Sequence, residues 1–143
     1  MTATRLPRGS VFLVEDEVMI RMMVADMLEE LGYSVAAEAG EINEAIRLAQ
    51  SAHFDLAILD VNVNGKVISP VAELIQARKR PFIFYLHPWE VDPEQPRIKV
   101  GWRSRFRHYT NLRKTQQRLR DLVTEFRFTT VRNVLSDIGL LAA

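Results

Sequence analysis

Cysteine is absent from the 143 residues of this chain. A disulfide scaffold and a thiolate metal site are therefore excluded, and the absence fits a reducing compartment. Hydrophobic residues, in contrast, make up 48% of the chain. That is enough apolar material for the buried core of one domain.

Long hydrophobic runs are also absent, since no run approaches the roughly 18 residues that a membrane span needs. The amino terminus shows no usable secretion signal, because Arg5 and Arg8 are followed by only four apolar residues before Glu15. We therefore expect a soluble cytoplasmic protein that makes no contact with membranes.

The net charge of +1 hides an asymmetry along the chain. Residues 1–84 contain 8 basic and 12 acidic side chains, a balance of −4, whereas residues 85–143 contain 11 and 6, a balance of +5. The acidic first part fits a metal-binding crevice. The basic second part fits nucleic acid or an acidic partner surface.

Strand and helix patterns alternate along the first part. The predicted strands are 11–15, 33–38, 55–60 and 81–86. The predicted helices are 17–31, 41–51 and 70–80, and the first has an apolar stripe of Ile20, Met23, Val24, Met27, Leu28 and Leu31. The methionines of this stripe are predicted to fill the core. The alternation predicts an α/β fold with a doubly wound parallel sheet.

Three carboxylates end two of the predicted buried strands: Glu15 and Asp16 follow the first, and Asp60 ends the third. Because ligands bind outside the carboxyl ends of parallel strands, we expect these acids to meet in one crevice. Three acids there would repel one another unless a cation neutralised them, and carboxylate oxygens suit a hard ion such as Mg²⁺. The alternative is that each acid merely ends a strand or begins a helix, where carboxylates are common.

The segments GSVFLVEDEVMI and FDLAILDVNVNG carry a family resemblance. With the pattern between and after them, they make residues 9–84 similar to the receiver domain of bacterial two-component response regulators. The resemblance implies a flavodoxin-like receiver fold in which Asp60 is the phosphoacceptor. It also implies Mg²⁺ held by Glu15, Asp16 and Asp60, with the main-chain carbonyl of Asn62 completing the metal site.

The chain departs from the receiver pattern at two positions. Receivers have Ser or Thr at the end of the fourth strand, where this chain reads FIFYLHPWE. They also have a Lys, usually before Pro, at the end of the fifth strand, and this chain contains no Lys-Pro pair. Both departures concern groups that relay phosphorylation in the family.

The part after strand four has a different resemblance. FYLHPWE and the following sequence make residues from about 85 to 135 similar to the carboxyl-terminal tail of polysaccharide deacetylases associated with exopolysaccharide export. His87 matches a histidine that assists deacetylation in that family. The Asp-His-His metal set of those enzymes has no counterpart here, because His53 and His108 are the only other histidines. We therefore expect no deacetylase activity.

Residues 85–143 form an atypical basic segment with two alternative structures. After a predicted helix at 111–125, a strand at 126–131 and a helix at 132–141 would complete a five-stranded sheet. Arg132 would then be the candidate phosphate-contacting cation, although its planar fork differs from the compact ammonium of a Lys. The alternative is an undocked tail.

Basic and aromatic residues alternate over residues 97–109, which read RIKVGWRSRFRHY. Such a segment could bind phosphate backbones and stack bases. No nucleic-acid fold signature accompanies these charges, so we favour a loop that packs on the domain and expect no nucleic-acid binding.

The function implied is that of a phosphoacceptor in a two-component phosphorelay. A histidine kinase or a phosphotransfer protein would donate the phosphoryl group to Asp60, and a downstream protein partner would receive the signal. Apart from self-phosphorylation and self-dephosphorylation, we expect no enzymatic activity. The alternative is a pseudo-receiver, a protein-binding module without efficient phosphotransfer. The third hypothesis is a remnant of a polysaccharide deacetylase.

Overall fold

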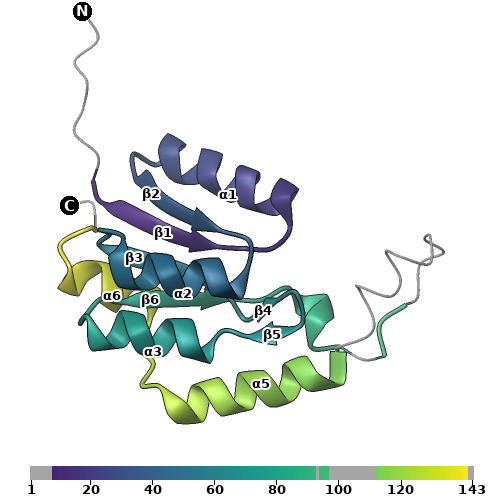
Figure 1. Cartoon of the computed structure of the whole chain (residues 1–143). Coiled ribbons are helices and arrows are strands. Elements are labelled where there is room, and N and C mark those ends of the chain that lie inside the picture. The colour runs from purple at the N-terminus through teal and green to yellow at the C-terminus, as the bar shows by residue number, and fades with distance from the viewer. Residues whose placement is uncertain (1–7, 93, 97–111, 142–143) are drawn as a thin grey trace, which may run out of the picture.

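The computed structural model describes residues 8–92, 94–96 and 112–141 (Figure 1). The basic and aromatic segment 97–109, with His108, therefore lies outside the described residues. None of the described helices is long and apolar enough to cross a membrane.

A parallel four-stranded sheet with the order β2-β1-β3-β6 forms the centre of the described chain. Its strands are β1 (Ser10–Val14), β2 (Ser34–Ala39), β3 (Leu56–Asp60) and β6 (Phe82–Tyr85). The helices α1 (Val18–Glu30), α2 (Ile42–Ser51) and α3 (Ser69–Ala77) follow the first three strands in turn. This alternation confirms the predicted α/β fold with a parallel sheet, because each strand and helix of the first part lies close to its predicted place.

The main core lies between the sheet and the pair α2 and α3, which stand in front of the sheet in Figure 1. Alternate residues of β1 and β3 point to this side, since successive side chains of a strand face opposite sides of a sheet. The sheet residues of this cluster include Phe12, Val14, Ala57 and Leu59, and the helix residues include Ala45, Ala49, Val71, Ala72 and Ile75. Val11 and Leu13 are also fully buried, so β1 is covered on both faces.

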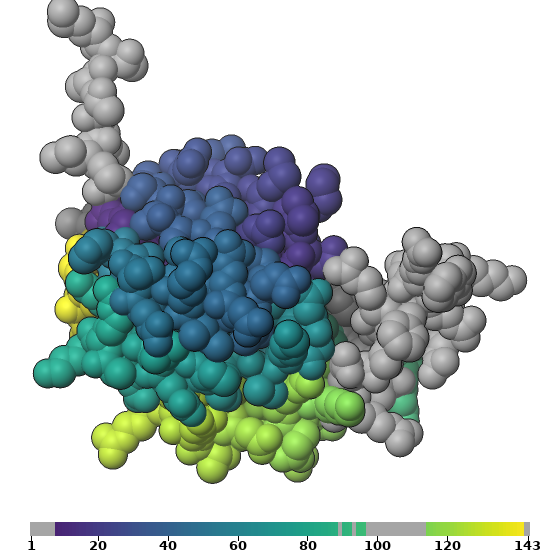
Figure 2. Space-filling model, in the orientation of Figure 1, coloured from purple at the N-terminus to yellow at the C-terminus, as the bar shows by residue number. Residues whose placement is uncertain are grey.

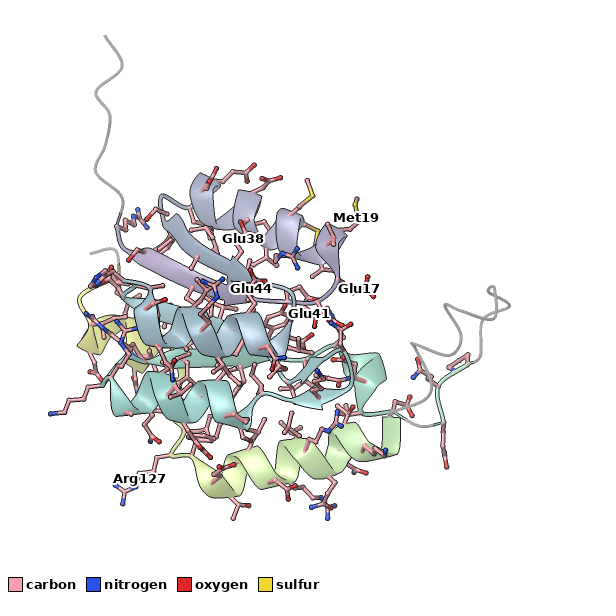
Figure 3. The ribbon with its side chains drawn as sticks, in the orientation of Figure 1. Glu17, Met19, Glu38, Glu41, Glu44 and Arg127 are labelled. Carbon is pink, nitrogen blue, oxygen red and sulfur yellow. The ribbon has the colours of Figure 1, made fainter. Side chains whose placement is uncertain are left out.

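The methionines of α1 do not fill the core, which corrects the sequence prediction. Met23 is 54% exposed and Met27 is 55% exposed. Met19 projects away from the ribbon in Figure 3. The physical reason is that α1 rests on β1 and β2, while no described helix packs closely against its other side. When the apolar stripe of a helix is wider than the surface it packs against, the residues at the edge of the stripe stay exposed to water.

The predicted strand at 126–131 is wrong. Residues 127–130 have no regular structure, and the helix α6 (Val131–Asp137) starts where that strand was to end. Aromatic packing replaces strand pairing here: Phe126 meets Phe82 edge-on at 5.4 Å between ring centroids. Thr130 then caps α6 by accepting a hydrogen bond from the backbone N–H of Asn133 at 3.2 Å.

The carboxyl-terminal part is not an undocked tail either. The helix α5 (Leu112–Glu125) agrees with the predicted helix at 111–125, and its surface lies against that of α3 in Figure 2. Leu122 and Phe126 are buried in the main core. The described sheet thus has four strands, with an aromatic cover beside β6 in place of a fifth.

Candidate functional site

The three predicted carboxylates lie together at the carboxyl ends of β1 and β3. One oxygen from each of Glu15, Asp16 and Asp60 lies within 4.8 Å of the others. Glu15 is 1% exposed and Asp60 is 2% exposed, while Asp16 is half-buried. The parallel strands explain this meeting, because β1 pairs directly with β3 and both end at the same edge of the sheet.

Backbone N–H groups hold each carboxylate in place. The donors belong to the turn after β1 and to the short hairpin after β3, whose strands are β4 (Asn62–Val63) and β5 (Lys66–Val67). The hydrogen bonds run from Glu17 to Glu15 at 2.8 Å, from Asn64 to Asp16 at 2.9 Å and from Asn62 to Asp60 at 3.1 Å. The hairpin after β3 thus supplies the N–H groups that bind two of the three carboxylates, Asp16 and Asp60.

Burial makes the ionised form of these acids costly. It raises the pKa of Asp60 to about 8, against the opposing hydrogen bond from Asn62, and the nearby acids Glu90, Glu15 and Asp16 raise it further. Burial also raises the pKa of Glu15. A hard divalent cation would reverse this penalty, since its charge favours the carboxylate form and its preferred ligands are oxygens. The residues present therefore fit Mg²⁺.

Tyr85 completes the site from β6, and sequence reasoning missed it. Its backbone pairs with that of Asp60 in the parallel register, and its hydroxyl donates a hydrogen bond to Oε2 of Glu15. Burial raises the pKa of this phenol, and the negative charges of Glu15, Asp60 and Asp16 raise it further. The signal in the sequence was the tyrosine at the end of strand four, which was noted only as the lack of a Ser or Thr.

Arg118 is the cation that the structure brings to the loop after Asp60. Its guanidinium donates to the side-chain oxygen of Asn62 at 2.8 Å and to the carbonyl oxygen of Gly65 at 2.6 Å. Arg132 lies exposed on α6 and lacks the preceding strand on which its predicted role depended. The prediction that Arg132 follows a fifth strand is therefore wrong. No local motif marks Arg118, because its partners lie more than fifty residues away.

His87 lies beside this site without joining a metal cluster. Its ring meets that of Tyr85 edge-on at 5.9 Å, and its backbone N–H donates to Oε2 of Glu90 at 2.8 Å across the short helix η1 (Pro88–Glu90). Among the residues that the structure describes, the carboxylate trio is the one group of three or more acids and histidines placed to hold a metal. The described chain thus offers no histidine-based metal set of the deacetylase kind.

Two family models match the chain. The model of the response regulator receiver domain covers residues 11–79, which contain all three carboxylates. This part is a response regulator receiver domain. The chain also belongs to DUF3473, a domain family of unknown function, through residues 64–136. That description names no activity, so the resemblance to deacetylases stays a prediction.

Regulators with receiver domains are among the relatives of this receiver domain. The transcriptional regulatory protein PdtaR of Mycobacterium tuberculosis is 32% identical over an alignment 124 residues long, and the match covers 71% of this chain and 60% of PdtaR. The chain thus spans less than two thirds of that relative's length. What PdtaR does as a whole protein therefore does not pass to this chain.

Solved structures show the same fold. The signal receiver domain of a modulated diguanylate cyclase from Desulfovibrio desulfuricans G20 matches 78% of this chain and 98% of its own, with a TM-score of 0.53 and 24% identity. PhyR from Bartonella quintana, solved with the anti-sigma factor NepR, matches 67% of this chain and 43% of its own, with a TM-score of 0.50 and 24% identity. At this level of identity the likeness supports the receiver fold alone.

Proposed function

We propose that this chain is a phosphoacceptor receiver that takes a phosphoryl group onto Asp60. The observation that carries the proposal is the meeting of Glu15, Asp16 and Asp60 within 4.8 Å at the end of β1 and β3. A buried carboxylate with two further acids beside it is the arrangement that a metal-assisted phosphoryl transfer requires, because this chemistry depends on positioning and charge neutralisation.

Asp60 acts as the nucleophile in this reaction. One of its carboxylate oxygens attacks the phosphorus atom of a phosphohistidine, the bond between phosphorus and nitrogen breaks, and the electron pair returns to the imidazole. The product is an acyl phosphate on Asp60. The N–H of Asn62, which donates to Oδ1 of Asp60 at 3.1 Å, orients the carboxylate for this attack.

Glu15, Asp16, Asp60 and the main-chain carbonyl of Asn62 would hold Mg²⁺ at this site. When bound, Mg²⁺ supplies positive charge that stabilises the ionised carboxylates and the transferring phosphoryl group. Because the pKa of Asp60 is about 8 in the metal-free protein, a large part of this carboxyl is protonated at neutral pH. The nucleophile is therefore expected to form in step with cation binding.

A histidine kinase or a phosphotransfer protein is the proposed phosphoryl donor, and a protein partner in the cytoplasm is the proposed receiver of the signal. PhyR, whose receiver fold this chain shares, has been solved with a protein partner, NepR. That precedent supports a protein partner in general, and the chemistry of Asp60 supports the phosphohistidine donor.

A pseudo-receiver is the second candidate, and Tyr85 favours it. Where receivers place a small hydroxyl residue at the end of strand four, this chain reads Tyr85-Leu86-His87, and the Tyr85 hydroxyl already donates a hydrogen bond to Glu15. A phosphoryl group with fewer specific contacts can shift the protein between two states less strongly. Under this hypothesis the fold binds a partner without efficient phosphotransfer.

Phosphorylation by acetyl phosphate tests the proposal. With Mg²⁺ present, intact-protein mass spectrometry should show one added phosphoryl group on the wild type and none on Asp60→Asn. Asp26→Asn, which changes an exposed acid of α1, is the matched control and should be labelled like the wild type. A wild type that stays unlabelled, under conditions that label an ordinary receiver, would favour the pseudo-receiver.

A further inference from the structure

The hydroxyl of Tyr85 lies where the three carboxylates meet. It donates to Oε2 of Glu15, and the negative charges of Glu15, Asp60 and Asp16 all act on it. The other oxygen of Glu15 accepts the N–H of Glu17 at 2.8 Å. In the metal-free protein the phenol therefore donates a side-chain hydrogen bond to one of the three carboxylates, that of Glu15.

A neutral hydroxyl is a weak substitute for a cation at such a place. It can donate one hydrogen bond and carries no net charge. It therefore stabilises the carboxylate of Glu15 but leaves most of the electrostatic repulsion among the three acids. A divalent ion would neutralise the cluster better, and it would compete with the phenol for the electron density of Oε2 of Glu15. The hydrogen bond to Tyr85 is thus a cost that the ion must overcome.

We propose that Tyr85 occupies the cation's place in the metal-free protein, competes with Mg²⁺ for Glu15, and thereby sets the metal affinity of the site. This inference rests on the proposed metal site and names the residue that controls it. Tyr85 is a positioning residue here, because it acts on the metal through Glu15 and not on the phosphoryl group.

Displacement of the Tyr85 ring would affect a neighbouring ring, that of His87. The ring of Tyr85 contacts that of His87 edge-on at 5.9 Å between ring centroids, and His87 is the N-cap residue of the short helix η1. In turn, η1 contacts α5, the helix that carries Arg118. Metal binding that displaces the phenol therefore changes the surroundings of His87 first. Through the contact between η1 and α5, metal binding then affects the carboxyl-terminal part of the chain.

Magnesium titration of Tyr85→Phe tests the competition directly. The substitution keeps the ring and removes the hydroxyl, so Mg²⁺ should bind about ten-fold more tightly than to the wild type, which is the value of one hydrogen bond to a charged group. Tyr33→Phe is the matched control, because the Tyr33 hydroxyl donates to the carbonyl of Leu140 at 3.0 Å, away from the carboxylates. Its affinity should equal that of the wild type.

Each other outcome overturns a distinct idea. Equal affinity in Tyr85→Phe and wild type would show that the hydroxyl does not compete, and weaker affinity would show that it prepares Glu15 for the metal. A wild type that binds no Mg²⁺ at all would overturn the proposed metal site itself. Circular dichroism and the unfolding midpoint of each variant would separate these results from a loss of folding.

The imidazole signals of His87 in NMR provide a second readout. In the wild type, Mg²⁺ should shift the His87 ring resonances while leaving those of the exposed His53 unchanged. In Tyr85→Phe the His87 shift should shrink to less than about half, because no hydrogen bond remains for the ion to displace. A shift of undiminished size in that variant would show that His87 responds by another route, and would overturn the coupling through Tyr85.

Discussion

The guanidinium of Arg118 donates a 2.8 Å hydrogen bond to the side-chain oxygen of Asn62, 56 residues earlier in the chain. A second bond, to the carbonyl of Gly65 at 2.6 Å, ties the same side chain to the other end of the β4–β5 turn. The two family matches meet through this contact, because Asn62 follows the candidate phosphoacceptor and Arg118 belongs to the DUF3473 part. The second part of the chain therefore holds the β4–β5 hairpin, whose N–H groups bind Asp16 and Asp60.

Removal of this contact should loosen both parts. We expect Arg118→Ala to lower the free energy of unfolding by about 2 kcal/mol, since two charge-assisted hydrogen bonds are lost and the Asn62 and Gly65 oxygens lose a partner. Urea denaturation followed by circular dichroism measures the change. Arg120→Ala, which alters an exposed residue of the same helix, should stay within about 0.5 kcal/mol of the wild type. A similar loss in both variants would mean that helix propensity and not the contact was responsible.

Neutralisation of Asp16 should weaken the metal site. We expect Asp16→Asn to reduce Mg²⁺ affinity by about an order of magnitude or more, because one charged oxygen ligand is lost from a cluster of three. Isothermal titration at constant pH measures the affinity, with Asp26→Asn as the control for a lost surface charge. Equal affinity in Asp16→Asn and the wild type would remove Asp16 from the ligand set.

The stability of the metal-free protein should depend on pH through Asp60. Its pKa is about 8 in the folded state against an ordinary value of 3.8, so between these values the folded state retains a proton that the unfolded state has lost. Stability therefore falls as pH rises from about 4 to about 8, and the penalty stays constant above that range.

Comparison of the wild type with Asp60→Asn isolates this effect. The variant should be little different at pH 4 and should become progressively more stable than the wild type toward pH 8, in buffers that contain a chelator. Chemical denaturation at several pH values provides the measurement. Added Mg²⁺ should remove most of the advantage of the variant. Parallel curves for the two proteins over this range would contradict a raised pKa at Asp60.

Packing of the carboxyl-terminal part can be tested at Phe126, which is 5% exposed and meets Phe82 and Phe84. Phe126→Ala should destabilise the protein by about 3–5 kcal/mol, as expected for a buried aromatic side chain. Phe128 is 50% exposed, so Phe128→Ala should cost clearly less. Equal effects of the two substitutions would indicate that α5 and the following turn do not share the receiver core.

Much of the receiver part followed from local patterns. Apolar runs that end at Glu15 and Asp60 predicted parallel strands, and strand ends in such a sheet gather at one edge, so the carboxylate trio was predictable. Gly32, which follows the predicted helix 17–31, and Pro70, which begins the predicted helix 70–80, favour helix boundaries by their conformational preferences. Each of these preferences depends on only a few neighbouring residues, so the strand ends and helix boundaries can be predicted from the sequence alone.

The parts that could not be predicted depend on distant partners. The alternation in FRFTTV suggested a strand, but Phe126 and Phe128 pack their rings on β6 instead, and no pattern within six residues reveals that choice. Likewise, the stripe on α1 indicated a helix correctly, yet only the arrangement of neighbouring helices decides how much of a stripe is covered. Tyr85 lies at the site because the parallel register pairs it with Asp60. Arg118 reaches the site through its hydrogen bond to Asn62, which lies 56 residues earlier in the chain.

All the methionines in the part of the chain that the structure describes lie on α1, and each of the four is more than half exposed. With no cysteine anywhere in the sequence, the oxidisable sulfur atoms among the described residues are thus gathered on one helix surface. Peroxide would convert these thioethers to polar sulfoxides on a face already in water, and the packed interior would not be altered. Oxidative damage to this receiver would therefore change its surface chemistry before it changed its fold.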